Sequence, residues 1–590
     1  MTVGRTVAAA LAMLLAWGGC TNNPYPDEDS GKKILYAPFN SPPKTLDPAT
    51  AYSVVDHKIT GPVYETLLEY HFLQRPYALI PSIAREVPQP ESLPGGRVGY
   101  LFRLRDDLIY QDDPCFAAFG DPGRSTRQMT AADLAFELMR IGDPDVNSPV
   151  ITTFAKVAGL TDFSQRLAQR REQDPAFAAR RIDHQYAEVG PVAGLEVLSA
   201  TDLRLVLVEP YPQILYWFAM EFTTPVPWEA IAYYDGEEGR DHFNEHPVGS
   251  GPYRVELYDK RNRIVLVRNP NWYGIRHPEW KAPAAIYPSE GEAEDAALGR
   301  LDPQYVGKPL PFIDRVEFRL EKETIPSFNK FLQGYYDSSH IIQESFDNIV
   351  QEGDLSPEMR ALGMRLEKSI SPSVSYLGFN MLDPVVGTAT GERGRKLRQA
   401  MSLAIDVEEY LRIFQNGRGV PAQSPIPPGL FGYDADYQNP YRQLDLDRAR
   451  ALLADAGYPR GVDPNTGKPL RLTYDTPDTQ ARSRLRFQFF VDAWTRIGLD
   501  VEIAATNYNQ FREKVRQGSY QIFQWGWIAD YPDPENFLFL LWSPMAEAKS
   551  RGPNTANFEN ARYDRLFLEM RNLENGPHRL ELIRKLIAIV

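Results

Sequence analysis

The chain has 590 residues, a length that predicts several domains because a single hydrophobic core stops growing well below this size. Its formal net charge is −14 at pH 7 and it has no dense run of Lys and Arg. A nucleic-acid partner is therefore disfavoured, since phosphates require neutralising cations. A hydrophobic share of 43% is typical of a globular protein.

The first twenty residues have the pattern of a targeting segment. Arg5 precedes a short apolar run, Val7–Trp17, which is too short to span a bilayer permanently and ends in Gly18-Gly19-Cys20. The small-small-Cys ending resembles a bacterial lipoprotein signal; an ordinary secretory signal with a chance cysteine is the alternative. We expect a signal peptide over 1–19 and a lipid on Cys20 that anchors the chain to a membrane, in the periplasm or at the cell surface. Residues 20–32 would form the lipidated start and a polar tether.

Strands and helices alternate in the first half of the chain. The expected elements are a strand at 33–37, a helix at 59–70, an apolar element at 79–84, a strand at 99–110, a helix at 131–141, helical segments within 142–190, two strands within 195–207, a helix starting within 211–218 and a strand at 263–268. The helix at 131–141 has the clearest signal, because Thr130 is a good N-cap and Leu134, Leu138 and Ile141 form one apolar stripe.

The second half continues the alternation after a Pro-, Gly- and acid-rich stretch, 274–311, which we expect to be a surface insertion. The strand at 314–320 alternates cleanly and is expected to open a second unit. The further elements are a helix at 325–333, a strand at 375–381, a helix ending at Asp406, a helix capped by Asp445, a strand at 470–474, a helix at 481–497 and a strand at 501–504. The fold class is therefore α/β, or mixed α+β. The helical pattern at 580–590 stops without a cap, so we expect the natural chain to continue.

Motifs for catalysis are weak. Gly249-Ser250-Gly251 is not a nucleophile elbow, and His242-Phe-Asn-Glu-His246 is not a zinc-binding His-Glu-x-x-His pattern. No phosphate-binding glycine loop occurs, and the only cysteines are Cys20 and Cys115, so no disulfide, metal site or cofactor is expected. We expect a protein without enzymatic activity.

The most informative stretch is Gln524–Phe537, which follows a strand-like run and contains two indoles, a phenol and three carboxylates. Aromatic faces that exclude water and a fixed carboxylate can together hold a cationic amine. A buried Trp-rich strand with a solvated acidic turn is the plainer interpretation of the same residues.

Nine segments, in order, resemble the extracellular solute-binding proteins of family 5, which deliver dipeptides and oligopeptides to ABC transporters. The segments are Thr45-Leu-Asp-Pro48, Tyr64-Glu-Thr-Leu67, Pro247-Val-Gly-Ser-Gly-Pro-Tyr253, Arg268-Asn-Pro-Asn-Trp-Tyr273, Tyr376-Leu-Gly-Phe-Asn380, the helix 397–406, Pro421-Ala-Gln-Ser-Pro425, the helix end 449–458 and Trp525 to Phe537. Each is weak alone, and their common order is what carries the resemblance.

The resemblance implies a two-lobed periplasmic binding protein fold of type II-like form, with an extra domain. Lobe 1 would comprise 33–64 and 192–312, the extra domain 65–191, and lobe 2 the residues 313–590, with a C-terminal return to lobe 1 missing. The implied function is a monomeric substrate-binding protein of an ABC importer. It would hold extended peptides between its lobes by ammonium anchoring and backbone pairing, and pass them to the permease.

Within this family an aspartate like Asp530 forms a salt bridge with the α-ammonium group of the ligand. Tyr531, Trp525, Trp527 and Asn380 are expected to line the site because they lie near the matched segments, whereas Asp533 and Glu535 are expected to be ordinary loop carboxylates. Three alternatives stay open: a periplasmic hydrolase that uses the carboxylates of 530–535, a binding protein for nickel, haem, an opine or a sugar, and a sensor or chaperone without a transport role on the same scaffold.

Overall fold

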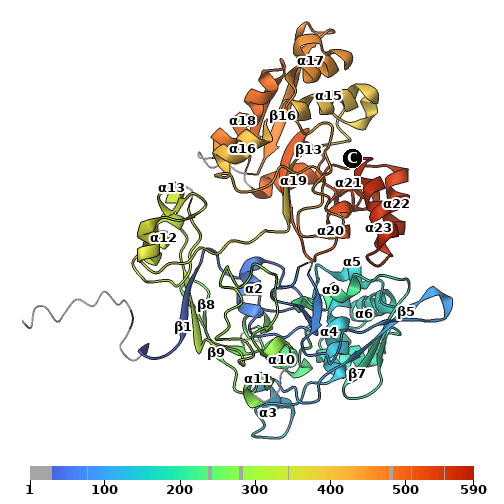
Figure 1. The fold of residues 1–590 in the computed structure, drawn as a ribbon. Helices are drawn as coiled ribbons and strands as arrows, with labels where there is room; N and C mark the ends of the chain where they lie inside the picture. Colours follow the sequence, from blue (N-terminus) through green and yellow to red (C-terminus); the bar gives the residue numbers. More distant parts are fainter. Residues whose placement is uncertain are drawn as a thin grey trace, which may run out of the picture. The chain divides into compact units, whose positions relative to one another are not determined.

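A computed structural model describes residue 25 and residues 29–75, 77–236, 242–277, 283–342, 345–477, 483–506, 508–550 and 552–590. The chain forms two compact units. The first extends to Leu366 and the second from Glu367 to Val590, with the short segments 75–77 and 211–213 counted in the second (Figure 1). None of the helices in the described ranges has the length and apolarity needed to cross a membrane. Cys20 and the expected signal peptide lie outside the described residues.

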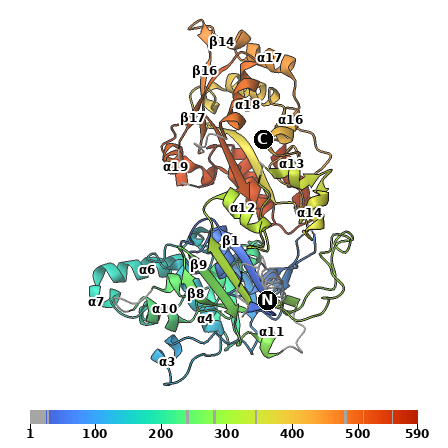
Figure 2. The same ribbon diagram turned by 90° about the vertical axis from the view of Figure 1, so that its left-hand side faces the viewer.

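The first unit is built on a four-stranded sheet in the order β1-β10-β9-β8, whose strands lie side by side in Figure 2. β1 (Ile34–Phe39) is parallel to β10 (Arg315–Leu320), and β10 is antiparallel to β9 (Arg263–Arg268), which pairs with β8 (Tyr253–Asp259). One face of the sheet carries apolar side chains into a core, and the other is polar. On the polar face Asp29, from the expected tether, forms an ion pair with Arg315 at 2.6 Å.

The position of β10 corrects the expected domain boundary. Residues 314–320 do form a strand, but it pairs with β1 and β9 of the first unit and does not open the second. The second unit therefore begins after Leu366 and not at 313. Alternation of polar and apolar residues shows that a segment is a half-buried strand, but it does not show which strand is its neighbour.

A second sheet of the first unit, in the order β4-β5-β7-β6, crosses the expected limit of the extra domain at 191. β5 (Val98–Arg103) lies between β4 (Pro90–Ser92) and β7 (Asp202–Leu207), and β7 pairs with β6 (Leu195–Val197). Residues 195–207, which we expected in lobe 1, thus share a sheet with the expected extra domain. Helix α4 (Ala131–Gly142) packs against β6 and β7 of this sheet, α6 (Leu160–Gln173) packs against α4, and α8 (Ile182–Val189) packs against α6.

The helix expected at 59–70 is wrong in its bounds. α2 spans Val54–Thr60, starts at a capping box made by Ser53 and Asp56, and ends before Gly61-Pro62. The chain then turns and enters the short strand β2 (Leu68–Tyr70). Pro62 lacks the N–H that a continuing helix would need, which explains the early end.

Three of the matched sequence motifs meet at one buried carboxylate. Glu65 accepts hydrogen bonds from Trp272 Nε1 at 2.6 Å and from Ser250 Oγ at 3.1 Å. Burial raises the pKa of Glu65 to about 8. A Cβ at Gly249 would lie 2.1 Å from the carbonyl oxygen of Val63, so the backbone approaches here as only glycine allows. These motifs therefore stabilise the first unit.

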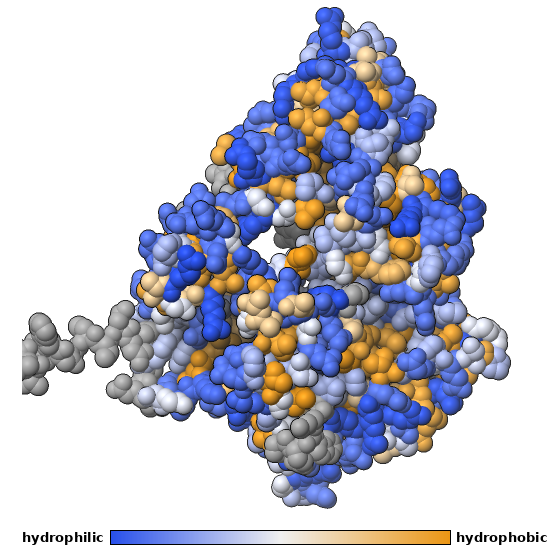
Figure 3. Space-filling model, in the orientation of Figure 1, coloured by the Kyte–Doolittle hydropathy of each residue, from blue (hydrophilic) through white to orange (hydrophobic). Residues whose placement is uncertain are grey.

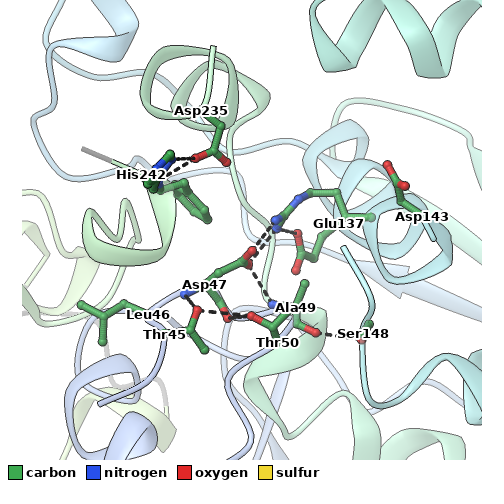
Figure 4. A network of polar contacts seen from close by, with 12 residues as sticks. Thr45, Leu46, Asp47, Ala49, Thr50, Glu137, Asp143, Ser148, Asp235 and His242 are labelled. Atoms are coloured by element: carbon green, nitrogen blue, oxygen red, sulfur yellow. Dashed lines mark hydrogen bonds and ion pairs between the residues drawn. The ribbon is translucent and has the colours of Figure 1, made fainter. Parts of the chain in front are cut away.

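The Thr45-Leu-Asp-Pro48 segment is fixed in the same way, by the network in Figure 4. Arg140 of α4 donates to both carboxylate oxygens of Asp47, at 3.0 and 2.6 Å, and to Glu137 at 2.8 Å. Ser148 Oγ donates to the carbonyl of Ala49 at 2.7 Å. Arg140 and Glu137 are fully buried, and burial raises the pKa of Glu137 to about 8. In the same view His242 contacts Asp235 at 3.6 Å.

The second unit has a four-stranded sheet in the order β13-β18-β16-β17. β16 (Arg471–Thr476) is parallel to β17 (Asp500–Ala505) and to β18 (Ile522–Ile528), whereas β13 (Ser373–Phe379) is antiparallel to β18. One core lies between this sheet and the helices α15 (Glu392–Leu403), α17 (Leu446–Asp455) and α18 (Ser483–Thr495). A separate core joins α20 (Glu535–Leu538), α22 (Ala561–Arg571) and α23 (Pro577–Ile587). The surface in Figure 3 mixes hydrophilic and apolar residues, as globular proteins commonly do.

Candidate functional site

The candidate site lies where β18 ends. The strand stops at Ile528, and the chain passes through a loop with Pro532 and Pro534 before α20 begins at Glu535. Asp530, two residues beyond the strand, is partly buried. Its backbone N–H donates to Asn536 Oδ1 at 2.8 Å, and its Oδ2 accepts from Asn536 Nδ2 at 3.2 Å. The loop therefore holds this carboxylate in a defined orientation.

The other two carboxylates of the loop are buried and bonded, which differs from the plain loop carboxylates we expected. Asp533 accepts two hydrogen bonds from Arg579 of α23, at 2.8 and 2.7 Å, and both side chains are nearly inaccessible. Glu535 accepts from the hydroxyl of Tyr531, and burial raises its pKa to about 7. Asp533 and Glu535 thus hold the loop in shape, whereas Asp530 lies at the more accessible end of the loop.

Two of the expected lining residues have structural partners. Tyr531 is buried and its hydroxyl is bonded to Glu535. Asn380, at the end of β13, is 1% exposed and donates to the carbonyls of Gly518 at 3.2 Å and Tyr520 at 3.0 Å. The Asn380 carbonyl oxygen accepts from Asn557 at 3.2 Å. Burial and these bonds assign Asn380 to the protein's own framework.

The two indoles of β18 lie on the same face of the strand and are partly exposed. Trp527 donates from Nε1 to Asn536 Oδ1 at 3.1 Å, and its ring meets Phe539 edge-on with centroids 5.2 Å apart. Trp525 stacks on Phe511, also with centroids 5.2 Å apart. Trp527 and Asp530 are therefore bonded to the same side chain, Asn536, whereas Trp525 lies on the strand at a greater distance from the loop.

A cavity of about 380 Å³ opens beside the same strand, within the second unit. It is lined by Ser375, Thr476, Pro477, Arg486, Gln524, Trp525 and Gly526. Thr476 ends β16, so the cavity lies at the carboxyl end of a parallel strand, where α/β sheets commonly bind ligands. Arg486 brings a guanidinium group that can pair with a carboxylate or a peptide carbonyl. We did not expect Arg486 here, because three arginines alternate along 482–486 and the sequence does not show which one faces a cavity.

Comparison with known proteins gives the chain clear relatives. The family model described as bacterial extracellular solute-binding proteins, family 5 Middle, matches residues 94–548. The dipeptide-binding protein of Escherichia coli (strain K12) is 21% identical over 567 residues, which covers 94% of this chain and 86% of the relative. The periplasmic oligopeptide-binding protein OppA of Salmonella typhimurium is 20% identical, with 94% and 84% covered. Heme-binding protein A of Haemophilus influenzae is 29% identical over 349 residues, with 59% and 53% covered.

Solved structures agree with the fold. The periplasmic binding protein DppA of Helicobacter pylori, in complex with the peptide STSA, superposes with a TM-score of 0.64 at 19% identity, covering 95% of this chain and 91% of the other. The murein tripeptide binding protein MppA of Escherichia coli gives a TM-score of 0.63 at 17% identity, with 95% and 91% covered. The predicted mixed α/β class and two-lobed binding-protein fold are confirmed.

Proposed function

Because the chain belongs to family 5 of the bacterial extracellular solute-binding proteins, we propose that it is the substrate-binding component of an ABC importer for short peptides. The matched relatives that cover most of the chain are named for binding dipeptides, tripeptides or oligopeptides. The proposed role is capture and delivery of the peptide without chemical change.

The observation that carries the proposal is the fixed carboxylate of Asp530 at the end of β18, with Trp527 bonded to the same amide. An α-ammonium group that meets a partly desolvated carboxylate forms a charge-assisted hydrogen bond, which is stronger than a neutral one. The cavity beside Gln524 and Trp525 supplies further polar groups for the rest of the ligand. Asp530 is the residue we propose as the ammonium anchor.

The bonding of the neighbouring carboxylates supports binding over hydrolysis. A hydrolase of the 530–535 loop would need a second carboxylate that can move a proton or activate water. Asp533 is held by Arg579 in a buried ion pair, and Glu535 is buried against Tyr531. Both side chains are buried away from a ligand, so the loop is better suited to presenting one charge than to acid–base chemistry.

The proposed location is the periplasm or cell surface, with a lipid anchor at Cys20 and a permease as the partner. The relatives named as periplasmic support the location, and the small-small-Cys ending supports the anchor. Replacing Cys20 with Ser should move the protein from the membrane to the soluble fraction; unchanged membrane retention would contradict the anchor.

The function is tested by native mass spectrometry of the purified protein, followed by calorimetry with peptides of two to five residues. We expect a peptide to co-purify, and Asp530→Asn to weaken its binding by at least about tenfold, as loss of a charge-assisted bond implies. Asp447→Asn, an exposed aspartate on α17 of the same unit, is the matched control and should bind normally. Co-purified haem, or cleavage of the peptide, would contradict the proposal.

A further inference from the structure

Asn536 is a buried amide that connects the two residues proposed to meet the ligand. It is 1% exposed, and its Oδ1 accepts from the backbone N–H of Asp530 at 2.8 Å and from Trp527 Nε1 at 3.1 Å. Its Nδ2 donates to Asp530 Oδ2 at 3.2 Å. Nothing in the sequence pattern distinguished this asparagine from an ordinary residue of the first turn of a helix.

The contacts require an amide. The oxygen takes two N–H donors, and the nitrogen supplies the proton that the carboxylate of Asp530 accepts. An aspartate at position 536 has nearly the same shape but would place a second carboxyl group against Asp530, so the two groups would repel each other or share one proton, and the neutral amide donor would be lost. An aliphatic residue would leave the indole N–H and the Asp530 N–H without their acceptor, at the cost of an unsatisfied buried group.

Hydrogen bonds within the same turn also hold Asn536 in place. Its N–H donates to the carbonyl of Asp533 at 3.1 Å, and Asp533 Oδ1 also accepts from the N–H of Glu535 at 2.8 Å. Asp533 is fixed by Arg579, which in turn donates to Asn575 at 2.6 Å and to the carbonyl of Met570 at 3.2 Å. A continuous series of bonds therefore extends from α23 through the start of α20 to the carboxylate of Asp530.

We propose that Asn536 is a positioning residue that sets how strongly Asp530 discriminates for a charged ligand amino terminus. The proposal rests on the proposed function, because it concerns the same ligand group. In metal sites, residues that orient a ligand by a hydrogen bond typically change affinity by about 10- to 100-fold when they are replaced, and we expect an effect of that order for the carboxylate of Asp530. The ligand class implied is a peptide with a free, protonated α-amino group, bound in preference to its N-acetylated form.

The test compares one short peptide, free and N-acetylated, by calorimetry on the full chain. We expect Asn536→Asp and Asn536→Ser to reduce the free-over-acetylated affinity ratio by about tenfold or more, while the affinity for the acetylated peptide changes little. Asn465→Ser, at an exposed turn of the same unit, is the control and should leave the ratio unchanged.

The outcomes separate the two proposals. If Asp530→Asn abolishes the preference for the free over the acetylated peptide but both Asn536 variants retain this preference, the positioning role is overturned and the ammonium anchor stands. If Asp530→Asn also keeps the ratio, the anchor fails and the positioning role fails with it. Circular dichroism and binding stoichiometry restrict the comparison to folded protein.

Discussion

Single residues divide into those that stabilise the fold and the one proposed to bind the ligand. Glu65, Asp47 and Asn380 all belong to segments that resemble the family, and each is buried with protein partners. Asp530 belongs to such a segment too, but it is only partly buried and lies at the exposed end of a strand. Membership in a matched motif is thus a poor guide to ligand contact, and burial separates the two roles.

Asn380 gives a direct test of this distinction. Replacing Asn380 with Ala removes the donor to two carbonyls and the acceptor for Asn557. We expect the free energy of unfolding to fall by about 1–3 kcal/mol, because buried groups lose their partners. Peptide affinity should stay within about twofold of the wild type. Denaturant unfolding and calorimetry measure the two quantities; a large loss of affinity at unchanged stability would return Asn380 to the binding site.

Glu137 predicts a pH dependence of stability. Burial raises the pKa of Glu137 to about 8 from an ordinary value of 4.5. Between these two pH values the Glu137 carboxyl group is protonated in the folded protein but ionised in the unfolded chain. Its contribution to stability is therefore complete below about pH 4.5 and is lost as the pH rises through 8. Glu137→Gln does not titrate and can still accept from Arg140. We expect the melting temperature of this variant, relative to the wild type, to rise between pH 5 and pH 8.

The control for that series is Glu172→Gln, an exposed position on α6 of the same unit. Its melting temperature should follow the wild type at every pH. A constant difference between Glu137→Gln and the wild type across the range would contradict the expected shift at Glu137.

At the scale of elements, the 530–537 loop depends on a helix that is distant in sequence. Arg579 of α23 is 2% exposed and is paired with Asp533, which is equally buried. The pair fixes the start of α20, and Asn536 lies in that turn. The shape of the candidate site is thus a property of α23 as well as of β18.

Arg579→Met should therefore destabilise the protein, because the charge of Asp533 loses its partner. Leaving Asp533 buried without its partner is expected to destabilise the second unit by about 3–5 kcal/mol. The double variant Arg579→Met with Asp533→Leu should recover most of this loss, because a buried pair replaced on both sides leaves no uncompensated charge. Denaturant unfolding measures both. Equal stabilities of the single and double variants would show that the pair does not carry the expected coupling.

Elements with local signals could be predicted from the sequence, whereas their partners could not. The caps at Thr130 and Asp445 placed α4 and α17 correctly, and alternation located β10. The pairing of β10 with β1 joins residues about three hundred positions apart, and no local pattern encodes such a neighbour. Asn536 and Arg486 were missed for the same reason, since their roles exist only once distant segments have come together.

At the scale of the molecule, two units with separate cores are combined in one chain of a binding-protein family. In the second unit, one sheet carries the cavity with Arg486 and the strand that leads to Asp530. This arrangement suits recognition of a peptide through its charged amino end and its backbone, which every peptide shares, and leaves side-chain preference to weaker contacts. We therefore expect the protein to discriminate between ligands by their terminal charge more than by their sequence.

The most direct test of this claim is the affinity of the wild type and of Asp530→Asn for one short peptide, free and N-acetylated, measured by calorimetry at neutral pH. The wild type should prefer the free peptide by about tenfold or more, and Asp530→Asn should lose that preference while binding the acetylated peptide as the wild type does. A wild type that binds both forms equally, or an Asp530→Asn variant that keeps the full preference, would contradict the assignment of Asp530 as the ammonium anchor.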